Sequence, residues 1–127
     1  TVHGIFHKTK ISLLHYPYPL LFKEKSFLGV KVADPRDIGC MKLDAIASRG
    51  TKKDFIDLFF LLREVPFAEL LRLFEKKYRR VDYNVMNVLR SIIYFADARR
   101  DPEPTMLKTY SWKKLERVLE DEVKRFL

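Results

Sequence analysis

Two helices joined by almost no connecting chain are the feature of the sequence that most restricts its fold. Asp34 is a good N-cap residue, and Pro35 suits the first position of a helix. Gly50 is typical of the residue just beyond a helix C-terminus, so we expect the first helix over residues 35–49. Thr51, the next residue, suits the cap of a second helix. With so short a connection, the two helices are expected to fold back against each other.

The second helix is expected to run from its cap at Thr51 to about Arg63, before Pro66 stops it. Asp54, three residues after the cap, makes a near capping box. Apolar side chains surround Asp57 on nearly every side, so we expect this helix to be buried. Because an unpaired buried carboxylate is strongly unfavourable, Asp57 then needs a partner.

The two helices carry a cluster of charged residues. Lys42 and Arg49 are seven residues apart and therefore share a face of the first helix, as Asp54 and Asp57 share a face of the second. Folding back at the junction is expected to bring both cations against both carboxylates. One interpretation is a buried ion-pair clamp that joins the helices. The other is a nucleotide-phosphate or metal-adjacent site, in which Lys42 binds phosphate and Asp57 orients or activates a group.

The first quarter of the chain carries all of the predicted β-structure. Residues 2–6 and 10–14 are expected to form a hairpin, and residues 28–33 a third short strand. Three further helices are expected after the first pair, at about 66–79, at about 83–97 and from Ser111 to the C-terminus. The order predicts an α+β fold with a short N-terminal antiparallel β segment of about three strands, followed by a bundle of about five helices.

Length, charge and apolar content restrict the class of protein. The 127 residues, 47% of them apolar, predict one compact unit with its own core. The 25 basic and 17 acidic side chains leave a net charge of +8, which favours an anionic partner such as nucleic acid or nucleotide phosphates. No apolar run approaches the roughly 20 residues that cross a bilayer, so we expect a cytoplasmic protein without a membrane partner. The single cysteine, Cys40, fits a reducing compartment and a packed position in a helix.

A run of basic and aromatic residues is a candidate nucleic-acid contact. It consists of Lys76, Lys77, Tyr78, Arg79 and Arg80. Proteins that bind phosphates and bases use this mixture of side chains, although the end of a helix also attracts cations through its dipole. The three histidines form no recognised zinc set and are interpreted as surface side chains: His3, His7 and His15.

The helix pair also resembles a known family. Residues 34–62, DPRDIGCMKLDAIASRGTKKDFIDLFFLL, resemble the motif that follows the catalytic core in nucleotidyltransferase-like proteins of the AbiEii/AbiGii abortive-infection type. In that motif a lysine on one helix precedes an Arg-x-x-x-Lys-Asp-x-x-Asp-Leu run on the next. The corresponding residues of this chain are Lys42, then Arg49, Lys53, Asp54, Asp57 and Leu58. The resemblance extends to residues 10–14, 16–19, 94–98, 102–107 and 111–112.

The resemblance implies an activity and a set of roles. Such proteins transfer a nucleoside monophosphate from a nucleoside triphosphate (NTP) to an acceptor with Mg²⁺, in several cases as the toxin of a toxin–antitoxin pair that acts on RNA. It implies catalytic roles for Lys42, Asp54 and Asp57, and phosphate binding by Lys42, Arg49 and Lys53. It also implies that residues 1–33 are edge strands of a nucleotidyltransferase-like sheet and that residues 34–127 are its helical region.

Two motifs of nucleotidyltransferases are absent from this sequence. A Gly-Gly-Ser/Thr turn holds the triphosphate in these enzymes, and an Asp-x-Asp pair places the metal ions. The four glycines of this chain are isolated, no two aspartates stand two apart, and Ser12 occupies the strand position where many relatives have a third carboxylate. We therefore expect the chain to be the C-terminal part of a longer protein and to be inactive alone. The alternative is a non-catalytic basic helical module that binds RNA or a partner protein.

Overall fold

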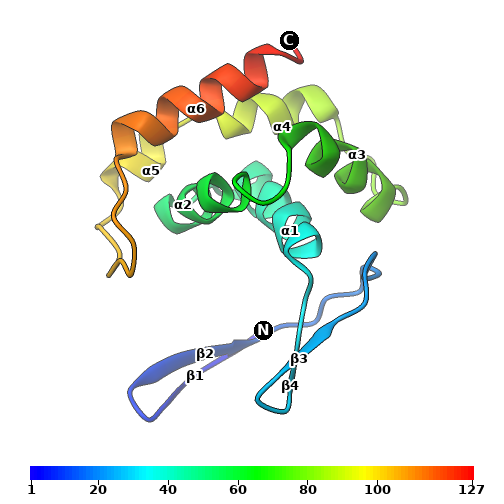
Figure 1. Ribbon diagram of the computed structural model, residues 1–127, viewed down its shortest axis with the longest axis vertical. Coiled ribbons are helices and arrows are strands. Elements are labelled where there is room, and N and C mark those ends of the chain that lie inside the picture. Colours follow the sequence, from blue (N-terminus) through cyan, green and yellow to red (C-terminus); the bar gives the residue numbers. More distant parts are fainter.

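Four short strands form two separate antiparallel hairpins in the N-terminal quarter of the protein. The computed structural model describes all 127 residues. The strands are β1 (Val2–Phe6), β2 (Thr9–Leu13), β3 (Lys25–Phe27) and β4 (Val30–Val32). β1 pairs only with β2, and β3 pairs only with β4. Both hairpins project from the same side of the helical body (Figure 1).

The turns of the hairpins explain where the strand prediction was wrong. The third strand was expected over residues 28–33, but Leu28 and Gly29 form the turn between β3 and β4, with φ angles of 51° and 79°. His7 and Lys8 take the same left-handed conformation in the first turn, with φ of 47° and 62°. Positive φ at both central residues suits a two-residue hairpin because it matches the twist of the strands. A three-residue strand such as β3 is too short to show an alternating pattern in the sequence.

The remaining chain forms five helices and one short helical segment. They are α1 (Pro35–Ser48), α2 (Lys52–Leu61), α3 (Phe67–Lys77), α4 (Val85–Ile92), α5 (Ala96–Arg100, the short segment) and α6 (Trp112–Lys124). The α+β class is confirmed, but the helix expected over residues 83–97 is two segments. The amides of Ile93 and Tyr94 bond to carbonyls three residues earlier, a tighter pattern that ends α4.

The helix boundaries around the first pair follow the predicted signals. The Asp34 carboxylate accepts the backbone N–H of Arg36 at the start of α1. Gly50 takes a φ of 57° between α1 and α2, a conformation that favours glycine. The capping box of Thr51 and Asp54 is present at the start of α2. These interactions lie within a few residues of each other in the chain, which is why the sequence reveals them.

Helix α1 is the centre of the helical body, because it contacts α2, α3 and α4. Helix α6 lies across α2 and α4 (Figure 1). A Cβ atom at Gly39 would meet a Leu70 side-chain carbon at 2.6 Å, so the glycine allows α1 and α3 to approach closely. Leu43 of α1, Leu58 of α2 and Leu115 of α6 are fully buried between these helices.

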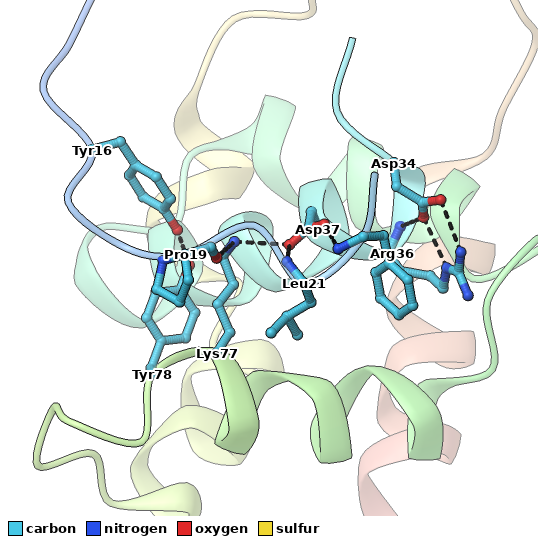
Figure 2. Close-up of polar contacts among 9 residues, drawn as sticks. Tyr16, Pro19, Leu21, Asp34, Arg36, Asp37, Lys77 and Tyr78 are labelled. Atoms are coloured by element: carbon cyan, nitrogen blue, oxygen red, sulfur yellow. Dashed lines mark hydrogen bonds and ion pairs between the residues drawn. The ribbon is translucent and has the colours of Figure 1, made fainter. Parts of the chain in front are cut away.

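A buried ion pair joins α1 to α3 and to the chain segment that precedes the second hairpin. We call residues 16–22 the strap. The Asp37 carboxylate accepts the Lys77 ammonium at 2.9 Å and the backbone N–H groups of Leu21 and Phe22 at 3.0 Å each. Lys77 also donates to the Pro19 carbonyl at 2.8 Å. Figure 2 shows the contact between Asp37 and Lys77. Both charged side chains have an exposed fraction of 0%.

We predict that the Asp37→Ala substitution lowers the free energy of unfolding by about 3–5 kcal/mol, because it leaves the Lys77 ammonium buried without its counter-ion. Urea denaturation measures this change. The matched control is Asp82→Ala, at an exposed aspartate, which we expect to change stability by less than about 0.5 kcal/mol. Equal effects of the two substitutions would contradict the prediction.

Candidate functional site

The structure brings Lys42 of α1 against two carboxylates of α2. The Lys42 ammonium lies 2.8 Å from an oxygen of Asp57 and 3.4 Å from an oxygen of Asp54. Burial alone would lower the pKa of Lys42, but the hydrogen bond to Asp57 and the nearby charge of Asp54 outweigh burial and raise that pKa. Lys42 is therefore a positive charge held in a fixed place at the α1–α2 junction.

Asp54 is the buried member of the cluster. One of its oxygens accepts the Thr51 hydroxyl at 2.7 Å and the Thr51 backbone N–H at 3.2 Å, and the other accepts Lys42. The same carboxylate therefore begins α2 and holds the cation of α1. Such a group is well suited to position Lys42, because its own hydrogen bonds fix it in place.

Asp57 is half exposed, contrary to the expectation that its helix surrounds it with apolar side chains. Its side chain is 51% exposed, against 8% for Asp54. Helix α2 buries the stripe that contains Phe55 and Phe59, and Asp57 lies on the other face, where Lys53 is also exposed. The many apolar residues of α2 predict a helix enclosed on all sides, but one face is exposed to solvent, and Lys53 and Asp57 lie on that face.

Arg49 does not join the cluster, which corrects the expected pairing of two cations with two carboxylates. It is the C-cap of α1, with a φ of −143°, so it does not continue the helical face of Lys42. Its exposed side chain lines a different pocket, together with Arg90 and Tyr94.

Asp57 lies where two open pockets meet. One pocket, of about 430 Å³, is lined by Lys42, Arg63 and Lys108 among others, and the second, of about 580 Å³, by Lys53 and Lys108. Four cationic side chains therefore line the two pockets that share Asp57, with Glu64 as a second carboxylate in the first pocket. Volumes of this order suit a small ligand.

Arg63 and Lys108 were not predicted from the sequence. The guanidinium of Arg63 lies 4.6 Å from the centre of the Phe60 ring, and the ammonium of Lys108 lies 5.7 Å from it. The aromatic ring thus gathers two cations beside Asp57. No local sequence signal marks Lys108, because it belongs to the irregular segment between α5 and α6 and reaches α2 only in the folded protein.

The carboxylates of this cluster do not fit a divalent metal ion. The Lys42 ammonium already occupies the place between Asp54 and Asp57. No group of three or more His, Cys, Asp or Glu side chains in the chain is arranged to hold a metal. We therefore assign these residues no direct part in binding Mg²⁺.

The basic and aromatic run divides between the surface and the interior. Lys76, Arg79 and Arg80 are exposed, whereas Lys77 and Tyr78 are buried. Lys77 and Tyr78 therefore present little surface to a ligand, and the exposed members of the run are its three other cations. Lys77 neutralises Asp37, and the Tyr78 hydroxyl is hydrogen-bonded to that of Tyr16.

Cys40 has the packed position expected of it, and Trp112 also packs against other helices. Cys40 is fully buried, and burial raises the pKa of its thiol to about 12, so the thiol is protonated at neutral pH. Trp112 packs edge-on against Phe55 and Phe95.

A comparison with known protein families finds a match that covers the helix pair and most of the chain around it. A family described as "Nucleotidyl transferase AbiEii toxin, Type IV TA system" matches residues 12–125. The chain belongs to this AbiEii toxin family. The match includes both helices of the Lys42 cluster, so the relationship inferred from residues 34–62 is confirmed.

One relative of this AbiEii family member is an uncharacterized protein of Aquifex aeolicus (strain VF5). The two are 40% identical over 122 residues, which cover 93% of this chain and 57% of the relative. The chain thus spans a little more than half the length of that protein.

No solved structure matches this chain. None of the helices of this chain is long and apolar enough to cross a membrane.

We predict that the two aspartates of the cluster differ in their contribution to stability. Asp54→Ala removes the capping box and should lower the free energy of unfolding by about 1–2 kcal/mol. Asp57→Ala removes a half-exposed ion pair and should lower it by less than about 1 kcal/mol. Thermal and urea denaturation of both variants measure the difference. A larger loss for Asp57→Ala would show that the cluster is chiefly a clamp.

We predict that Cys40 does not react with a thiol reagent such as iodoacetamide near pH 8 while the protein is folded, because its thiol is buried and protonated. Mass spectrometry after timed labelling measures the reaction. The same protein in denaturing urea is the control and should be labelled fully. Rapid labelling of the folded protein would contradict the assigned burial.

Proposed function

We propose that the chain is the C-terminal, helical part of a nucleotidyltransferase that moves a nucleoside monophosphate from an NTP to an acceptor. The observation that carries the proposal is the place of Lys42. Its ammonium is fixed by Asp54 and Asp57 at the mouth of an open pocket that Arg63 and Lys108 also line. Membership of the nucleotidyl transferase toxin family supports this reading.

Each residue of the cluster has a distinct role in this proposal. Lys42 binds a phosphate of the nucleotide, and Asp54 positions it from the buried side. Asp57, exposed at the pocket, orients a reacting group or releases Lys42 to the phosphate. Lys53 and Lys108 add positive charge on either side, which suits the charge that spreads over a transferring phosphoryl group. Arg49 lines another pocket and has no part here.

The metal ions of the reaction need ligands from outside this cluster. Transfer from an NTP with Mg²⁺ requires close carboxylates, and Asp54 and Asp57 are already paired with Lys42. We infer that residues beyond these 127 supply the Asp-x-Asp pair and the glycine-rich turn, and that the 127 residues alone do not catalyse transfer. The greater length of the Aquifex aeolicus relative is consistent with this division.

The two hairpins fit a role as edge strands of a larger nucleotidyltransferase-like sheet. Every residue of β1 to β4 is exposed, and the exposed side chains include Ile5 at 80% and Phe27 at 66%. Strands with free edges and apolar faces are suited to pair with further strands. We propose RNA as the acceptor. We also propose an antitoxin protein as the partner, which the type IV toxin–antitoxin description supports.

We predict that Lys42→Ala, made in the full natural protein, lowers nucleotide transfer by on the order of a hundredfold or more, because it removes a fixed charge from the transferring phosphate. The measurement is Mg²⁺-dependent incorporation of a labelled nucleotide, with the melting temperature determined in parallel. The matched control is Lys113→Ala, at an exposed lysine of α6, which should transfer at the rate of the natural protein.

Two outcomes would overturn the role of Lys42. Transfer by Lys42→Ala at the unaltered rate would show that Lys42 does not act on the nucleotide. Loss of folding in this variant would favour the ion-pair clamp instead.

A second candidate function is a non-catalytic basic helical module that binds RNA or a partner protein. The exposed cations Lys76, Arg79 and Arg80 favour it. Failure of the full natural protein to incorporate any nucleotide with Mg²⁺ would support the module, whereas incorporation by the isolated 127 residues would show that they contain a complete active site.

A further inference from the structure

A groove lies between the strap and the C-terminal end of α3, away from the Lys42 cluster. It has a volume of about 720 Å³ and shares no lining residue with the pockets around Asp57. Residues 16–19 of the strap form one side, and residues 76–81 form the other. Figure 2 shows the strap in place over α3, where Pro19 accepts the Lys77 ammonium. We call this feature the strap groove.

The strap groove is lined by cationic side chains and by no acidic ones. Lys76, Arg79 and Arg80 line it, are exposed, and form no ion pair with a carboxylate in the structure. Lys77 does not add to this charge, since Asp37 neutralises it inside the protein. The cluster around Lys42 differs, because its cations are mixed with carboxylates.

Flat, apolar surfaces lie beside these cations. The Tyr18 ring is half buried and makes edge contacts with the rings of Tyr16 and Tyr78, at centroid distances of 5.1 and 4.9 Å. Burial raises the pKa of Tyr16 to about 12, so its hydroxyl is uncharged at neutral pH. Pro17 and Pro19 are exposed on either side of Tyr18. The groove therefore combines rings with cations and contains no negative charge.

The strap is fixed before any ligand arrives. Asp37 accepts the amides of Leu21 and Phe22, and Lys77 donates to the Pro19 carbonyl. The hydroxyls of Tyr16 and Tyr78 are also hydrogen-bonded to each other. A ligand therefore meets ordered rings, and little conformational freedom is lost when it binds.

We propose that the strap groove binds single-stranded nucleic acid, with phosphates on Lys76, Arg79 and Arg80 and a base against Tyr18. Basic grooves with aromatic side chains bind single strands because each base presents a flat face. A duplex keeps its bases stacked inside and cannot offer one to the ring. This binding does not depend on nucleotide transfer, because it uses residues outside the Lys42 cluster. It builds on the second candidate function above, for which it names the groove and the single-stranded form of the ligand.

The test of charge is a triple substitution in the full natural protein: Lys76→Ala, Arg79→Ala and Arg80→Ala. Fluorescence anisotropy measures binding of labelled single strands of about 12 nucleotides, oligouridine RNA and oligothymidine DNA in separate arms. We expect affinity to fall at least about tenfold and the slope of log affinity against log salt to decrease by about 2, as loss of three phosphate contacts on a single strand requires. A higher affinity in one arm identifies RNA or DNA as the ligand.

The matched control removes the same charge elsewhere. Lys113, Lys114 and Lys124 are exposed on α6, and their triple alanine variant has the same net charge as the groove variant. It should retain the affinity and the salt slope of the natural protein to within about twofold, because at the ionic strength of the assay separate surface charges act locally. An equal loss in both variants would overturn the proposal in favour of binding by net charge alone.

The contact with bases is tested without any substitution. An abasic strand of the same length keeps every phosphate but offers no ring to Tyr18, so we expect it to bind the natural protein at least about fivefold more weakly. Equal binding of the abasic strand, or equal binding of a duplex of the same sequence, would overturn the proposal. This comparison remains decisive even if the triple variant fails to fold.

Discussion

The buried pair of Asp37 and Lys77 is the interaction on which much of the remaining arrangement depends. Two charges with no exposure to water are tolerated only when nearly all of their hydrogen-bonding capacity is used. Asp37 meets this condition with the amides of Leu21 and Phe22, and Lys77 with the Pro19 carbonyl. The pair therefore fixes the strap, which in turn sets where both hairpins leave the helical body and places the rings of the strap groove.

A second buried carboxylate performs the corresponding task at the α1–α2 junction. Asp54 accepts the Thr51 hydroxyl and backbone amide and so begins α2, while its other oxygen accepts Lys42. The Asp54 side chain thus couples the start of α2 to the position of the Lys42 ammonium. This coupling gives Lys42 a defined position at a pocket, and Asp57 remains available at the surface because Asp54 carries the structural role.

The sequence-based prediction was accurate where the determining contacts are local. The starts of α1 and α2 were predicted from Asp34 and from Thr51 with Asp54, whose bonding partners lie two or three residues away. It was wrong where a distant part of the protein decides the outcome. The sequence places Lys77 in a basic run that was expected to contact nucleic acid, but its partner Asp37 is 40 residues earlier in the chain. No pattern around Lys77 indicates that the strap and α1 cover it.

The sequence by itself determined the family, the α+β class, the helix pair and the chemical types gathered at its junction, because motif spacing and helix caps are properties of neighbouring residues. Only the tertiary structure decided which of these side chains meet. In the folded protein Lys42 pairs with Asp54 and Asp57, whereas Arg49 lines another pocket. Lys108 lies beside α2 only because the segment between α5 and α6 packs there. The physical reason is that burial and ion pairing depend on how separate segments pack, and those segments are up to several tens of residues apart in the chain.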